Sequence, residues 1–140
     1  MAIDAMSDYL EGKLGNLVLN GIAYVGPTSG IVYVGLFSGA VADTLTTGGA
    51  AQGEVAAGGY ARSAVQSGFT TAGVGTAFTN SGVINYPTAT ADWGTLSGVA
   101  IFDALTNGNA LLQGLLTVAK TVLSGDSAVF TSGQLSVTWL

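Results

Sequence analysis

The segment Ile31–Phe37, IVYVGLF, is the stretch that decides the fold. It consists mainly of β-branched and aromatic residues, which favour extended strands. Apolar side chains occupy both of its alternating faces, which is typical of a strand that is covered on both sides. The segment Gly98–Phe102, GVAIF, has the same character. We therefore predict two buried inner strands at these positions.

Shorter strand signals fill most of the remaining chain, separated by clusters of turn residues. They are predicted at residues 60–67, 74–78, 83–86, 110–117, 128–130 and 135–139, and residues 120–122 are expected to lead into the turn at 124–126. The strongest hairpin signal is Thr106-Asn107-Gly108-Asn109, because Asn-Gly readily adopts the positive φ values of a type I′ turn. Short strands with turns at intervals of about 8–12 residues are typical of sandwiches and jelly rolls. We predict a mainly all-β fold, an antiparallel β-sandwich or jelly-roll-like domain.

A single N-terminal α-helix is predicted over residues 7–20. Ser7 is a suitable N-cap, and Asn20-Gly21 is a suitable helix end. Apolar residues recur on one helical face at Leu10, Leu14, Leu17 and Val18. Two interpretations stay open: the helix packs on the core of its own domain, or it is an arm that docks on a neighbouring molecule.

The rest of the domain organisation is simple. We expect residues 1–140 to form a single β-sandwich domain. A long surface loop is predicted over residues 38–58, because its central part, Asp43–Ala57, is small, polar and rich in glycine and shows no periodicity.

The composition excludes several functions. The chain has no histidine or cysteine, three basic residues and a formal net charge of −5. Binding to nucleic acid or to anionic membranes depends on basic residues, so neither partner is expected. Charged residues make up only 8% of the chain, whereas about a quarter is usual for a globular domain. We therefore expect other subunits to cover part of the surface.

No catalytic, cofactor-binding or metal site is predicted. Zinc sites and most nucleophilic dyads need cysteine or histidine, and the chain has neither. The glycines of Gly73-Val74-Gly75 are not followed by the third glycine of a dinucleotide-binding motif. We expect a protein that acts by association and is not an enzyme.

The one arginine, Arg62, is predicted to form a structural ion pair. Its candidate partners are Asp92, Asp103 and Glu54, of which Asp92 and Asp103 are preferred. Each of the two aspartates is also suited to a structural role at the end of a strand or in a turn.

Three aromatic residues, Tyr60, Tyr86 and Trp93, form a second group of candidates. Core or interface positions are the preferred interpretation, because aromatic rings with polar tips are common at protein interfaces. The alternative is an aromatic platform that binds a sugar.

Several segments together resemble a family of small tailed-bacteriophage virion proteins, which are often labelled tail fibre proteins. These segments are Ser7–Glu11, Val32–Phe37, Gly58–Arg62, Tyr86–Thr95, Val99–Ala104, Lys120–Val122 and Gly125-Asp126. The most specific part is Pro87–Gly94, PTATADWG, within Tyr86–Thr95. The resemblance implies a component of the virion and transfers no catalytic residues.

Three functions are consistent with this resemblance. The first is a capsid cement or decoration protein that binds the major capsid protein on the outer surface and stabilises the shell. The second is a structural protein of the tail or tail fibre, and the third is a carbohydrate-binding module for host attachment. By analogy with decoration proteins, a homotrimer is expected. Fibre shafts have repetitive or coiled-coil sequence, and its absence here favours the first function.

Overall fold

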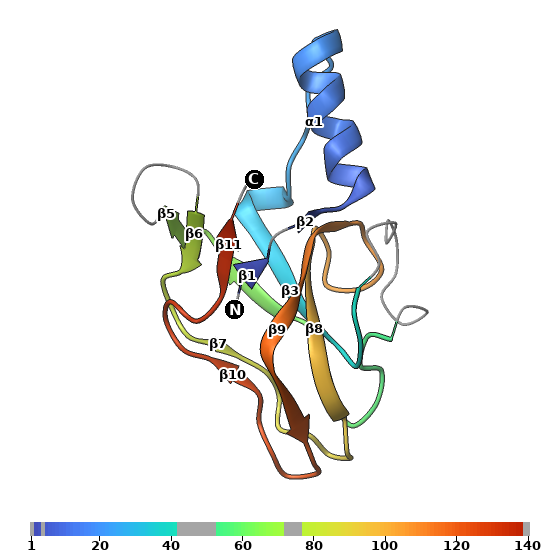
Figure 1. Cartoon of the computed structure of the whole chain (residues 1–140), viewed down its shortest axis with the longest axis vertical. Helices are drawn as coiled ribbons and strands as arrows, with labels where there is room; N and C mark the ends of the chain where they lie inside the picture. Colours follow the sequence, from blue (N-terminus) through green and yellow to red (C-terminus); the bar gives the residue numbers. More distant parts are fainter. Residues whose placement is uncertain (1, 4, 42–52, 72–76, 139–140) are drawn as a thin grey trace.

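The computed structural model describes residues 2, 3, 5–41, 53–71 and 77–138. Its elements in chain order are β1 (Ala2–Ile3), β2 (Ala5–Met6), α1 (Asp8–Asn20), a 3₁₀ turn (Thr28–Gly30), β3 (Ile31–Phe37), β4 (Ser63–Gln66), β5 (Phe69–Thr71), β6 (Ala77–Asn80), β7 (Ile84–Asn85), β8 (Gly94–Phe102), β9 (Ala110–Val122), β10 (Val129–Phe130) and β11 (Ser136–Thr138). Figure 1 shows α1 projecting from a body made of strands.

The largest sheet has five strands in the order β2-β9-β8-β3-β4, and all its pairs are antiparallel. The two segments predicted as inner strands, in β3 and β8, are neighbours in this sheet, with Val34 opposite Ile101. Both faces of these strands are covered, which explains why their sequences are apolar with little alternation. Val34, Leu36, Val99 and Ile101 pack in the main core cluster, and Phe37, Ala100 and Phe102 pack in a second cluster.

Two smaller sheets complete the fold. One has the order β1-β11-β6-β5, and the other pairs β10 with β7. Their pairs are antiparallel except β1 with β11, which is parallel. The predicted all-β class is therefore confirmed, and this parallel pair is an exception to the predicted antiparallel pattern.

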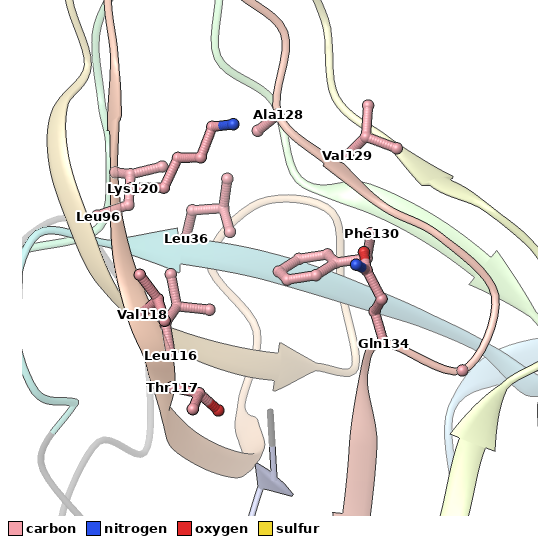
Figure 2. Close-up of a pocket in the computed structure, with 11 residues that line it drawn as sticks. Leu36, Leu96, Leu116, Thr117, Val118, Lys120, Ala128, Val129, Phe130 and Gln134 are labelled. Atoms are coloured by element: carbon pink, nitrogen blue, oxygen red, sulfur yellow. The ribbon is translucent and has the colours of Figure 1, made fainter.

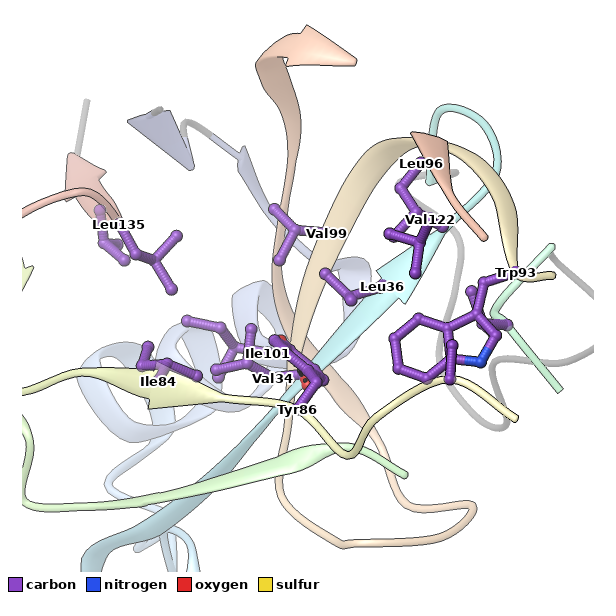
Figure 3. Close-up of a cluster of buried hydrophobic side chains, with 13 residues drawn as sticks. Val34, Leu36, Ile84, Tyr86, Trp93, Leu96, Val99, Ile101, Val122 and Leu135 are labelled. Atoms are coloured by element: carbon purple, nitrogen blue, oxygen red, sulfur yellow. Dashed lines mark hydrogen bonds between the residues drawn. The ribbon is translucent and has the colours of Figure 1, made fainter. Parts of the chain in front are cut away.

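The main core lies between the large sheet and the two smaller ones. Val34 and Val99 of the large sheet pack in one cluster with Ile84 of β7, Val137 of β11 and Leu135 just before β11. Figure 3 shows this cluster, which collects side chains from all three sheets. This packing of sheet against sheet is the architecture of a sandwich.

The predicted hairpin joins β8 to β9. Asn107 (φ 53°) and Gly108 (φ 68°) both have the positive φ values of a type I′ turn. The backbone N–H of Asp103 donates to the carbonyl of Asn109 across the turn, at 3.1 Å. β9 continues to Val122, five residues beyond the strand predicted at 110–117.

The predicted helix is also present. Ser7 Oγ accepts a hydrogen bond from the backbone N–H of Leu10 at 3.2 Å and donates one to the carbonyl of Ala110 in β9. Gly21 ends the helix in the left-handed conformation, at φ 67°. Leu10 is buried, whereas Leu17 lies exposed on the predicted apolar face. The helix is therefore attached to the sheet at its N-terminal end.

The segment predicted as a surface loop, residues 38–58, departs from that prediction at Glu54 and Val55, whereas Ser38, Ala40, Ala56 and Ala57 are exposed. Residues 42–52 lie outside the described residues. Beyond them, Val55 is buried, and its backbone N–H donates to the carbonyl of Leu36 at 3.0 Å. Glu54 forms an isolated antiparallel bridge with Phe37, the last residue of β3. Glu54 and Val55 therefore belong to the packed body of the domain.

Candidate functional site

The most concentrated polar cluster surrounds Arg62, in the loop before β4. The Nε and Nη2 atoms of Arg62 donate to the two carboxylate oxygens of Glu54, each at 2.7 Å. Its Nη1 atom donates to the carbonyls of Ala104 (2.9 Å) and Asn107 (2.8 Å) in the β8–β9 turn. The guanidinium carbon lies 3.4 Å from the ring centroid of Phe102, a cation–π arrangement. The cluster thus joins the segment of residues 54–62 to the β8–β9 turn, which lies more than 40 residues further along the chain.

The second half of the cluster is built around Tyr60. Its hydroxyl donates to Glu54 Oε1 at 3.1 Å and accepts from the backbone N–H of Leu36 at 2.8 Å. Burial and the negative charge of Glu54 raise the pKa of Tyr60 well above its usual value. Gly35 leaves the space for this arrangement, because a Cβ atom there would lie 2.9 Å from Glu54 Oε1 and 3.1 Å from the Phe102 ring.

This cluster is a structural element. The side chains of Arg62 and Glu54 are only 4% and 7% exposed, and both are held by charged hydrogen bonds. No substrate has access to groups that are buried to this extent. The arrangement therefore holds the start of β4 against Glu54 and against the β8–β9 turn.

The preferred partners of Arg62 in the sequence prediction were wrong, because Glu54 takes that place. Asp103 instead accepts from the backbone N–H (2.6 Å) and side-chain Nδ2 (2.7 Å) of Asn109, closing the β8–β9 turn. Asp92 accepts from the backbone N–H of Ser124 at 2.8 Å. Both aspartates therefore have the structural roles that their turn positions indicated.

The aromatic candidates do come together, but inside the domain. Tyr60 packs edge-on against Trp93, with centroids 5.4 Å apart, and stacks with Tyr86 at 6.3 Å. Tyr86 and Trp93 are buried. The hydroxyl of Tyr86 donates to the carbonyl of Val34 at 3.0 Å, and Trp93 Nε1 donates to the carbonyl of Gly58 at 3.0 Å. These rings belong to the core and offer no open platform for a sugar.

Asn80, at the end of β6, is a buried polar junction. Its Nδ2 atom donates to the carbonyls of Gly82 (2.7 Å) and Thr131 (2.9 Å), and its Oδ1 atom accepts from the N–H of Leu135 (2.8 Å). Asn80 ends β6, and Leu135 precedes β11, its neighbour in the sheet. An Asn in a turn signal gives no indication of such long-range bonds, so only the structure reveals them.

The structure also contains an open groove of about 420 Å³ between the second half of β9 and the segment around β10. Figure 2 shows Leu116, Val118 and Lys120 of β9 on one side and Phe130 and Gln134 on the other. Lys120 is its only charged lining residue. The residues that line this groove form no recognisable sequence motif, so no site was predicted here.

Groups that could hold a metal ion do not gather in the described part of the chain. Over residues 2, 3, 5–41, 53–71 and 77–138, no group of three or more acidic side chains is placed to hold a metal ion. Among the same residues, no helix is long and apolar enough to cross a membrane.

Comparison with known proteins identifies the class. A family model described as podophage GP4 fiber I protein gp80 matches residues 5–138, almost the whole chain. No match to the chain was found among curated proteins. The protein is thus a bacteriophage structural protein of the virion, as the sequence resemblance implied. It belongs to the podophage GP4 fiber I protein gp80 family.

Proposed function

We propose that this protein is a non-enzymatic structural component of the phage fibre, which acts by association with copies of itself and with other virion proteins. The proposal is supported by which side chains the domain buries and which it exposes. The prominent polar groups, such as Arg62, Glu54 and Asn80, are buried and bonded within the domain. Large apolar side chains, such as Val18, Leu19 and Val118, are instead exposed.

Buried polar groups and exposed apolar side chains favour a protein that acts by association and not by catalysis. Catalysis at neutral pH needs an accessible acid, base or nucleophile beside the substrate. The chain has no histidine or cysteine, and the carboxylates of Asp92 and Asp103 accept hydrogen bonds from backbone amides. Exposed apolar side chains are the groups that subunit contacts bury. Identical subunits usually form closed symmetric assemblies, and a trimer is our preferred form.

A second candidate is the capsid cement role, in which the partner is the major capsid protein. Its supporting observation is that the described chain is a compact body of short strands rather than a repetitive shaft. The family match supports the fibre assignment instead, so the cement role ranks second.

Locating the protein in purified virions tests both candidates. We expect an epitope-tagged chain to be found on fibres by labelled electron microscopy, with a copy number far below that of the major capsid protein. Uniform labelling of the shell, with a copy number near that of the major capsid protein, would support the cement role. Absence from the virion would exclude both.

A further inference from the structure

The C-terminal part of α1 and the segment after it form an exposed apolar arm, which we define as residues 17–25. Its large apolar residues are Leu17 (43% exposed), Val18 (78%), Leu19 (82%), Ile22 (57%) and Val25 (88%). Figure 1 shows this end of α1 pointing away from the strands. Monomeric proteins rarely expose continuous apolar patches of more than a few hundred Å².

The helix α1 needs packing against another surface to be stable. Isolated helices shorter than about 12–15 residues are marginal in water, and α1 has 13 residues. Gly12 and Gly15 lie within it, and a glycine in a helix interior is less favourable than alanine by about 1 kcal/mol. Leu10 is the only residue of α1 that its own domain buries. The domain therefore gives the arm little packing energy, and a neighbour has to supply it.

The chemistry of the arm favours a second copy of this chain as that neighbour. Residues 14–42 contain no charged residue, and the charged residues of α1, Asp8, Glu11 and Lys13, all precede the arm. Charged groups on a partner would lose their hydration on contact with the arm, and the arm offers no opposite charge to compensate for that cost. An identical arm is equally apolar, and contact through residues 17–25 does not require the burial of those three charges.

The exposed area is also sufficient for self-association. The five apolar residues expose on the order of 500 Å² per arm, so two arms that cover each other remove on the order of 1,000 Å² from water, near the lower limit of a specific interface. We infer that the arms of neighbouring copies pack against each other and form the contact through which this protein assembles. This inference rests on the proposed function, because it names the surface used for association.

The absence of native cysteine makes a direct test available. In Leu19→Cys, a disulfide can form only between chains, and it requires Cα atoms within about 7 Å. We expect mild oxidation of Leu19→Cys to give a covalent dimer on a non-reducing gel. The matched control is Val118→Cys, at a β9 position that lines the groove in Figure 2, which we expect to remain monomeric on the gel.

A second pair of variants tests whether the apolar side chains of the arm stabilise the assembly. Val18 and Val118 are both 78% exposed, so Val18→Asp and Val118→Asp change equally exposed valines on different surfaces. Light scattering of the wild-type chain should give a multiple of 13.9 kDa. Val18→Asp should reduce it to the monomer mass, whereas Val118→Asp should leave it unchanged. Near-ultraviolet circular dichroism of each variant checks that the core is intact, and the cysteine result stands independently if one variant does not fold.

Two outcomes would overturn the inference. One is a wild-type monomer at every concentration, together with no cross-link at Leu19→Cys. The other is loss of assembly in Val118→Asp but not in Val18→Asp, which would place the contact in the groove. Neither outcome affects the proposed location on the fibre, because the labelling experiment does not depend on assembly in solution. A monomer at every concentration would remove only self-association from the proposed function.

Discussion

Arg62 and Glu54 form a bidentate ion pair in the interior, with two nitrogen–oxygen distances of 2.7 Å. The pair connects the segment after residue 52 to the start of β4, and Nη1 of the arginine extends the connection to the β8–β9 turn. A planar guanidinium is suited to this position because it donates to a carboxylate and to two carbonyls at once. Lysine offers a single point charge and does not reproduce this geometry.

We predict that Arg62→Ala lowers the free energy of unfolding by roughly 3–5 kcal/mol, because Glu54 is left as an uncompensated buried charge. Glu54→Ala should cause a loss of similar size for the converse reason. The double variant should lose less than the sum of the two, since neither charge is then left unpaired. Urea unfolding of all three provides the double-mutant cycle. Lys120→Ala, which removes an exposed basic residue, is the control and should change stability by less than about 0.5 kcal/mol.

We predict that Gly58→Ala is strongly destabilising. Gly58 has φ +63°, and a Cβ atom there would lie 2.6 Å from the carbonyl oxygen of Ala91 and 2.9 Å from Trp93 Nε1. Gly133 is a matched control, because it also has positive φ (+77°) but no neighbouring atom within 4 Å of the added Cβ. Gly133→Ala should therefore show only the backbone strain, and Gly58→Ala should lose at least about 2 kcal/mol more, as overpacking requires. Equal melting temperatures for the two variants would contradict this steric explanation.

We predict that Tyr86 makes the domain sensitive to alkaline pH. Burial raises the pKa of Tyr86 well above its ordinary value of 10.0. The folded state then keeps the proton while the unfolded state releases it, so the stability contribution is complete below pH 10 and decreases above it. The slope is about 1.4 kcal/mol per pH unit for one such group.

Tyr86→Phe tests this sign. At pH 8 the variant should be less stable than the parent by about 1 kcal/mol, because the hydrogen bond to the Val34 carbonyl is lost. Above pH 10 the parent should lose stability faster than the variant, so their melting temperatures should converge. Thermal unfolding from pH 8 to pH 11 measures both curves, and parallel curves would show that Tyr86 does not titrate in this way.

Much of the fold follows from local sequence. IVYVGLF and GVAIF are strands because their β-branched and aromatic residues are covered on both faces, and the structure places them side by side in β3 and β8. Asn107-Gly108 and Ser7 have local steric and hydrogen-bonding preferences that fix a turn and a helix start. Such features need no knowledge of distant residues, which is why sequence alone predicted them.

The site depended on contacts that sequence does not encode locally. Glu54 was named as a candidate partner of Arg62 but was not preferred, because it lies in a stretch without periodicity that was predicted as a surface loop. Similarly, β1 and β2 have two residues each, and their partners are more than 100 residues away, in β11 and β9. Strands of two residues form because the neighbouring strands of the sheet are already in place. Their own β-propensity is too weak to be detected in the sequence.

We predict that alanine substitutions at Gly12 and Gly15 stabilise α1. Neither position has another atom within 4 Å of an added Cβ, so no clash opposes the change. Each substitution should favour the helix by about 1 kcal/mol, because alanine loses less backbone entropy than glycine. α1 is attached to the body only through its first turn, so the gain should appear as local protection of the helix and only weakly in the global melting temperature. Amide hydrogen exchange of residues 12–20 measures the local effect, and Gly82→Ala, at an uncrowded turn position outside α1, is the control. We expect slower exchange in α1 for Gly12→Ala and Gly15→Ala and no change in α1 for Gly82→Ala. Unchanged exchange in all three variants would contradict this prediction, because it would mean that packing by a neighbour, and not helix propensity, sets the stability of α1.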